Sequence, residues 1–311
     1  MSTSSTTLSQ PPEARLGEDS KPTKKSRFDR RATFWLLYLP PIFWLGLFFI
    51  VPILLMAAFS FREDLSGGVL RLWKPTLDQY AKLIATSSYW RLLGISILVA
   101  LAVSFSAVVL AYPIGYFLVF KAGRRTAFYL ILLLVPFWTS YLLRVMAWKL
   151  MLGSEGVINS FLSFIGFIHQ PIPILLYNRS AVILTLVYVW IPFVTLPIFA
   201  ALQRVEPALL EAASDLGAPP ARAFLRITFP LSLPGVIAGF FMVFIPTVGE
   251  YVTPLLVGGS RGSLYGNIIQ DFFSKAANWP FGSAMSIVML LITLVLVAFA
   301  LRLVDLRTLF E

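Results

Sequence analysis

Six long uncharged stretches of the chain are candidate membrane spans, and more polar segments separate them. The stretches are residues 32–61, 92–120, 126–143, 180–203, 227–249 and 276–301. An α-helix needs about 20 apolar residues to cross a bilayer, and a helix satisfies its backbone polar groups within the segment. The strands of a membrane barrel would instead alternate in polarity over segments of about 10 residues. The pattern therefore predicts an all-α membrane protein with about six transmembrane helices.

The composition supports a membrane protein and argues against other classes. Hydrophobic residues make up 58% of the 311 residues and charged residues 13%, and the mean hydropathy is +0.81. A soluble domain carries about 25% charged residues. The chain has no Cys and one His, which argues against a disulfide scaffold and a His/Cys metal site. We expect no bound metal and no cofactor.

The distribution of Lys and Arg predicts the orientation. With six spans, both termini and the second and fourth loops share one side, which holds 15 of these residues against 8 on the other. The basic side should be cytoplasmic. We therefore expect a cytoplasmic tail over residues 1–31, a first transmembrane helix over 32–61, a periplasmic loop over 62–91, a transmembrane core over 92–303 and a cytoplasmic C-terminus over 304–311.

Three polar segments allow more specific predictions. The tail is rich in Ser, Thr, Pro and charge and should be disordered. Its basic cluster indicates contact with anionic membrane lipids and no nucleic-acid binding, because no basic stripe lies on a folded soluble element. In the 62–91 loop we expect a short helix over 75–85. The loop over 153–179 has apolar stretches broken by prolines, which indicates an interfacial or re-entrant element.

The fourth loop, residues 204–234, has the clearest local pattern. Pro207 suits a first helical position, strong helix formers follow over 208–216, and Gly217 permits the left-handed conformation that ends a helix. A second helix should begin at Ala221, and Pro230 and Pro234 should break it before the membrane. The loop is thus predicted to be a short helix, a sharp turn and a second short helix.

Two interpretations of this helix–turn–helix remain open. A helix of about 10 residues is marginal alone and needs a surface to pack on. It could rest on the bilayer as an amphipathic helix, or it could protrude as a knob that fits a soluble partner. Glu211 and Asp215 lie four residues apart on one side of the helix.

The loop residues resemble a known motif. Glu211-Ala212-Ala213, Gly217, Ile227 and Pro230 match the EAA loop of the permease subunits of type I ABC importers in type and spacing, with Phe229 where that family usually has Leu. The resemblance implies the MetI-like fold of these permeases. It further implies that residues 208–216 form a coupling helix seated in a cleft of a cytoplasmic ATPase, which hydrolyses the ATP.

Four further stretches resemble the spermidine/putrescine permeases within that family. They are residues 135–144, 156–159, 248–252 and 278–282. The resemblance implies import of polyamines, a second homologous permease subunit, two copies of the ATPase, a periplasmic substrate-binding protein and a place in the bacterial inner membrane. Permeases for opines, other amino compounds or anions share parts of these stretches, so the same architecture serving another small solute is an alternative.

Two charged residues fall inside predicted spans at similar depth, Arg144 in the third and Glu250 in the fifth. A charge in the membrane must face protein or water. One interpretation is an ion pair between Arg144 and Glu250 that fixes the two helices. The other places Glu250 in the path of a cationic substrate, with the rings of Trp138 and Tyr251 adding cation–π attraction. The two interpretations are compatible.

The sequence carries no signature of an enzyme. It has no Walker A pattern for ATP and no Ser/His/Asp or Cys/His arrangement, so we expect no catalytic residue. A self-sufficient secondary transporter is an alternative of a different class. Such a transporter needs no surface for an ATPase, which makes the 204–234 loop the discriminating feature.

Overall fold

The computed structural model describes residues 27–63, 74–166, 168 and 176–303. Most of the predicted tail and the residues 304–311 lie outside this range. The chain divides into two compact units, Met1–Ile53 and Leu54–Glu311. The described residues are helical throughout, apart from loops and one bridge that pairs Arg62 with Pro75.

The first unit holds the start of the first predicted span. Helix α1 (Arg27–Leu45) leads into a π-helical turn, η1 (Gly46–Ile50), and α2 (Val51–Ser60) follows across the unit boundary. Residues Trp35–Ser60 are long and apolar enough to cross a membrane. A helix is therefore present where the first span is predicted, and it begins five residues earlier than predicted.

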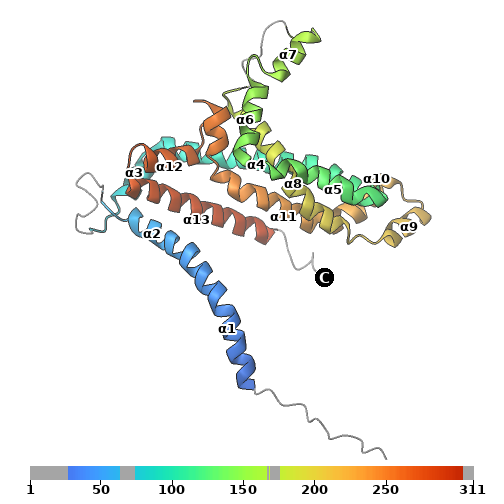
Figure 1. Ribbon diagram of the computed structural model, residues 1–311, viewed down its shortest axis with the longest axis horizontal. Helices are drawn as coiled ribbons and strands as arrows, with labels where there is room; N and C mark the ends of the chain where they lie inside the picture. Colours follow the sequence, from blue (N-terminus) through green and yellow to red (C-terminus); the bar gives the residue numbers. More distant parts are fainter. Residues whose placement is uncertain (1–26, 64–73, 167, 169–175, 304–311) are drawn as a thin grey trace, which may run out of the picture. The chain divides into compact units, whose positions relative to one another are not determined.

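The second unit holds the remaining helices and helical turns (Figure 1). In chain order they are α3 (Asp78–Ala85), α4 (Ser87–Phe120), η2 (Gly123–Arg125), α5 (Thr126–Leu134), η3 (Val135–Trp138), α6 (Tyr141–Leu152), α7 (Val157–Phe164), α8 (Arg179–Leu202), α9 (Pro207–Asp215), α10 (Pro220–Ala223), η5 (Phe224–Thr228), α11 (Phe229–Val248), η6 (Pro254–Gly258), α12 (Tyr265–Ser274) and α13 (Trp279–Leu303). The short helix predicted over 75–85 is present as α3.

Five helical segments in the described residues are long and apolar enough to span a membrane, and a bent pair makes a sixth. The bent pair corrects the third predicted span. The chain turns by 88° between Gly123–Trp138 and Tyr141–Phe164, because Thr139 adopts an extended conformation and ends η3. The apolar run over 126–152 is therefore two helices in different directions, which its hydropathy alone could not indicate.

The core of the second unit is a layer formed by α4, α8 and α11, which run alongside one another (Figure 1). Small residues allow the close approach. Gly235 on α11 lies so near α8 that an added Cβ would stand 2.4 Å from the Pro197 carbonyl oxygen and 2.5 Å from the Ala201 Cβ. Tyr112 joins α4 to α11 through a 2.8 Å hydrogen bond between its hydroxyl and that of Ser232.

We expect Gly235→Ala to destabilise the chain by about 1–3 kcal/mol, because overfilling a packed contact forces backbone shifts. Gly94→Ala is the matched control, since a Cβ at Gly94 meets no atom within 4 Å. The melting temperature in detergent should fall for the first variant and stay level or rise for the second. Equal melting temperatures would contradict the close contact between α8 and α11.

The second helix of the fourth loop does not end where the sequence predicts. Pro230 and Pro234 were expected to break it, yet the run Pro220–Val248 is continuous and long enough to span a membrane. The π-helical turn η5 widens the helix before Pro230, which lies in the first turn of α11. Proline is tolerated in a first turn, and neighbouring helices offset the bond lost at Pro234.

The end of the layer that carries α3 also carries α12, a helix absent from the sequence prediction (Figure 1). Its first residue, Tyr265, is buried, and its backbone N–H donates to the Ser96 hydroxyl of α4 at 2.8 Å. The rings of Tyr89, Phe272 and Phe281 pack around this end. The segment after α11 is therefore fixed to the start of α4.

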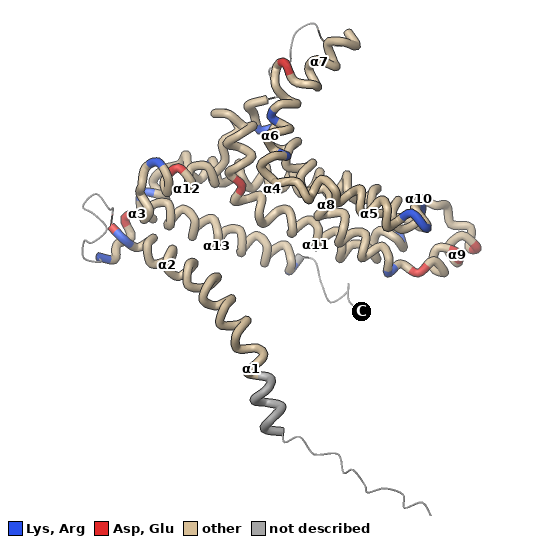
Figure 2. The backbone as a smooth tube through the Cα atoms, viewed as in Figure 1, with Lys and Arg blue, Asp and Glu red and all other residues tan. Residues whose placement is uncertain are grey.

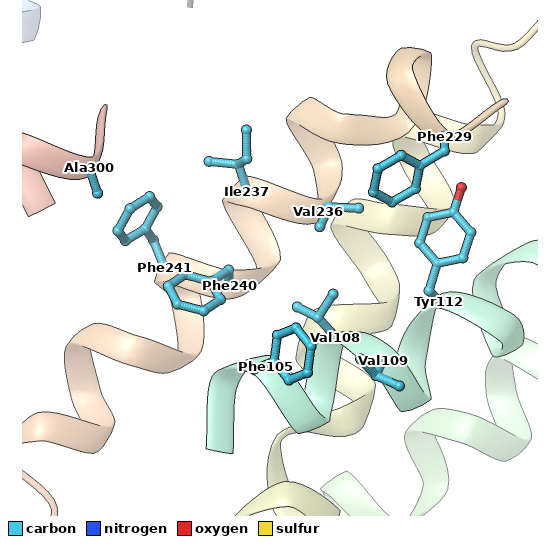
Figure 3. A pocket seen from close by; sticks show the side chains of 10 residues that line it. All are labelled: Phe105, Val108, Val109, Tyr112, Phe229, Val236, Ile237, Phe240, Phe241 and Ala300. Atoms are coloured by element: carbon cyan, nitrogen blue, oxygen red, sulfur yellow. The ribbon is translucent and has the colours of Figure 1, made fainter. Parts of the chain in front are cut away.

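A largely apolar groove of about 500 Å³ lies between α4, α11 and the end of α13 (Figure 3). Phe105, Phe240 and Phe241 contribute rings to its wall. Its one polar group, the Tyr112 hydroxyl, is already bonded to Ser232. The groove contains none of the predicted site residues and offers no charge to a polar solute.

Candidate functional site

The geometry of α9 follows from the residues at its two ends. Pro207 occupies the first turn, and Gly217 has a φ of +74°. The N–H of Gly217 donates to the Ser214 carbonyl and that of Ala218 to the Ala213 carbonyl, both at 2.9 Å. This is the Schellman arrangement that glycine permits at a helix end. The predicted short helix and sharp turn are confirmed.

Helix α9 projects from the end of the second unit, and no other helix of the described residues covers it (Figure 1). None of its residues is buried in the described part of the chain. Leu216, just beyond the helix, is 89% exposed and Leu209 is 44% exposed. An exposed apolar residue near each end of a short helix fits both predicted interpretations, a helix that rests on the bilayer and a knob that docks on a soluble partner.

Some of the predicted coupling residues lie on α9, and the others lie on the long helix that follows it. Glu211, Ala212 and Asp215 are exposed on α9, and Ala213 is half-buried. Ile227 lies in η5 and Pro230 in α11, on the continuous helix that connects the knob to the layer. Figure 2 shows acidic residues on α9 and basic residues near α10, with uncharged stretches along the long helices.

The second candidate site surrounds Glu250, at the turn that follows α11. Its Oε1 accepts hydrogen bonds from the backbone N–H groups of Val252 at 2.9 Å and Thr253 at 3.0 Å. The Thr253 hydroxyl in turn lies 2.5 Å from the Tyr141 hydroxyl of α6, and Tyr141 also interacts with the Glu250 carboxylate. The carboxylate thus holds the start of the turn leading into η6 and connects it to α6.

The predicted ion pair between Arg144 and Glu250 does not form in this structure, in which both residues are described. The Arg144 guanidinium instead lies over the Phe137 ring, with 4.7 Å from Cζ to the ring centroid. The physical reason is local. The backbone of the turn supplies donors for Glu250, and the bend before α6 brings Phe137 under Arg144.

The two predicted aromatic residues lie in different surroundings. Tyr251 follows Glu250, is 41% exposed, and has its carbonyl fixed by the Asn267 side-chain amide at 2.8 Å. Trp138 stands at the α5–α6 break and is 82% exposed. No contact between Trp138 and either Glu250 or Tyr251 occurs among the described residues.

Sequence reasoning missed Tyr141, Thr253 and Asn267, which hold this turn together. One local signal was available for the turn itself. A threonine–proline pair suits a helix start, and here Thr253 is the N-cap of η6 and Pro254 its first residue. Tyr141 and Asn267 carry no such signal, because both reach the turn through tertiary packing.

Comparison with known proteins identifies the architecture. A family model described as the inner membrane component of binding-protein-dependent transport systems matches residues 27–308. The chain belongs to this family. It is therefore a membrane-embedded permease subunit of an ABC importer and not an enzyme. The resemblance inferred from the EAA loop is confirmed at the level of the family.

Individual relatives agree with this assignment. The spermidine/putrescine transport system permease protein PotB of Escherichia coli K12 is 38% identical over 251 residues, which cover 80% of this chain and 90% of that protein. The inner membrane ABC transporter permease protein YdcU of the same strain is 31% identical over 284 residues, 86% of this chain and 89% of that protein.

The fold agrees with a solved structure of the same type. A chain from a bacterial ABC transporter involved in the import of the acidic polysaccharide alginate superposes with a TM-score of 0.67 at 20% identity, over 89% of this chain and 96% of that chain. The predicted type I ABC importer permease fold is confirmed.

Proposed function

We propose that this chain is a permease subunit of a polyamine importer and forms half of the translocation pathway. The observation that carries the proposal is the 38% identity to a spermidine/putrescine permease over 80% of the chain. The chemistry of the Glu250 turn supports it, because a carboxylate beside the partly exposed Tyr251 ring suits an ammonium group.

The proposal includes the partners that such a subunit needs. The α9 knob docks into a cytoplasmic ABC ATPase, of which two copies serve the complex. A second, homologous permease supplies the other half of the pathway, and a periplasmic binding protein delivers the solute. The chain itself binds no cofactor, since the ATPase hydrolyses the ATP. In this arrangement both termini are cytoplasmic.

The test is uptake by the reconstituted complex. Proteoliposomes that contain this chain, its second permease and the ATPase should accumulate radiolabelled spermidine or putrescine when ATP is inside and the binding protein is outside. Omission of this chain should reduce uptake to the level of empty vesicles. Accumulation of an amino acid or a phosphonate in place of either polyamine would contradict the proposed substrate and leave the family assignment intact.

A further inference from the structure

The first residues of α12 pack directly against the turn that carries Glu250. A Cβ added at Gly266 would stand 2.7 Å from the Gly249 carbonyl oxygen and 2.8 Å from the Glu250 carbonyl oxygen. Glycine allows two backbone segments to approach each other this closely. The start of α12 and the Glu250 turn are therefore in contact without a side chain between them.

The side chain of Asn267 joins the same two segments. Its Nδ2 donates to the Tyr251 carbonyl at 2.8 Å, and its Oδ1 accepts from the backbone N–H of Leu264 at 3.0 Å. Asn267 is buried, and an amide with its donor and its acceptor both bonded has one favoured orientation. It thus fixes the carbonyl of the residue directly after Glu250.

The start of α12 is itself fixed to the long helices. The backbone N–H of Tyr265 donates to the Ser96 hydroxyl at 2.8 Å, and that hydroxyl donates to the Leu92 carbonyl of α4 at 3.0 Å. The buried Tyr265 hydroxyl lies 3.4 Å from the Met285 carbonyl oxygen of α13. Asn267 therefore connects the Glu250 turn to a support that belongs to α4 and α13.

The direction of the Glu250 carboxylate depends on the shape of this turn. The carboxylate is half-buried, and its Oε1 is held by the backbone N–H groups of Val252 and Thr253. Hydrogen bonds weaken steeply as their angle departs from linear. Asn267 holds the carbonyl of Tyr251, which lies between Glu250 and both of these donors in the chain.

We propose that Asn267 is a positioning residue for the transported cation and acts through Glu250. Asn267 is buried and does not touch the solute. It keeps the Glu250 carboxylate in one orientation before the solute arrives, and a group that is already oriented binds without losing further conformational freedom. This inference rests on the proposed function, because it requires a cationic solute at Glu250.

The test is a double-mutant cycle on uptake by the reconstituted complex. Asn267→Ala and Glu250→Gln are made singly and together, and the initial rate of spermidine uptake is divided by the amount of folded complex. In the parent background Asn267→Ala should lower this rate about 3–10-fold, the factor that one net hydrogen bond corresponds to. In the Glu250→Gln background it should lower the rate less than about twofold, because the charge that Asn267 orients is already absent.

Asn159→Ala is the matched control. Asn159 is also buried, and its side-chain amide also donates to a backbone carbonyl, that of Gly153 at 2.9 Å. This variant should lower the melting temperature and leave the uptake rate per folded complex unchanged in both backgrounds. Gly266→Ala disturbs the proposed contact by a different route, through its added Cβ. It should show the same dependence on Glu250, and it carries the test if Asn267→Ala does not fold.

The outcomes separate this inference from the proposed function. An equal fold reduction in both backgrounds would assign Asn267 a purely structural role and overturn the inference. An unchanged rate in the parent background would overturn it as well. Both results leave polyamine import by the parent complex intact. Absence of polyamine uptake by the parent complex would overturn the proposed function and the inference together.

Discussion

Glu211→Lys is expected to reduce ATP-driven uptake by about 5–150-fold, the range that a coupling free energy of about 1–3 kcal/mol produces. Glu211 is exposed on α9, so the substitution disturbs no packing within the chain. It reverses a charge on the surface proposed to enter the ATPase. The measurement is solute uptake by reconstituted vesicles, with membrane insertion checked by the yield of folded chain.

Glu206→Lys is the matched control for this charge reversal. Glu206 is exposed immediately before α9, and its side chain makes no capping hydrogen bond. Uptake by this variant should stay near that of the parent chain. Gly217→Pro should uncouple transport by a different route, because proline fixes φ near −65° and Gly217 requires +74°. Normal uptake with Glu211→Lys and Gly217→Pro would contradict the role of α9.

Glu250→Gln is expected to reduce polyamine uptake about tenfold or more with little loss of stability. Glutamine retains a carbonyl oxygen that can accept from Val252 and Thr253, so the turn is preserved while the negative charge is lost. A hydrogen bond to a charged group contributes about 1.5–3 kcal/mol, and about 1.4 kcal/mol is a factor of ten in affinity. The measurement is the concentration dependence of spermidine uptake, together with the melting temperature.

Arg144→Gln separates the two interpretations of the intramembrane charges. Arg144 has no ion pair with Glu250 in the described chain, so the two variants should differ in their effects. Glu250→Gln should lower uptake of the cation, whereas Arg144→Gln should mainly lower the melting temperature, because it loses the contact of the guanidinium with the Phe137 ring. If both variants lower only the melting temperature, and by equal amounts, the Glu250 charge has a structural role and does not contact the substrate.

The coupling loop could be predicted from the sequence because its structure is set by neighbouring residues. Proline at a first turn, a run of helix formers and glycine at a left-handed position each act within one helix end. The long spans were predictable for a similar reason, since hydropathy over about 20 residues determines whether a helix can cross a bilayer.

The turn around Glu250 and the start of α12 could not be predicted in the same way. Tyr265 bonds Ser96 over a separation of 169 residues, and Tyr141 reaches Thr253 over 112. The bend at Thr139 could not be predicted from the apolar run that contains it. Hydropathy indicates which residues avoid water, but it does not indicate the direction in which a helix runs. The Arg144–Glu250 ion pair was predicted because the two residues lie at similar depth in their spans. In the structure, backbone N–H groups bind the Glu250 carboxylate, and the Arg144 guanidinium lies over the Phe137 ring.

The central claim is that this chain works as a permease coupled to an ATPase, and co-purification tests it most directly. The tagged chain is extracted from its native membrane in a gentle detergent, and mass spectrometry identifies what remains bound. We predict an ABC ATPase and a second six-span permease in the complex, with the ATPase lost when Glu211→Lys is introduced. A chain recovered alone or as a homo-oligomer, reproducibly without an ATPase, would contradict the account and favour a self-sufficient transporter.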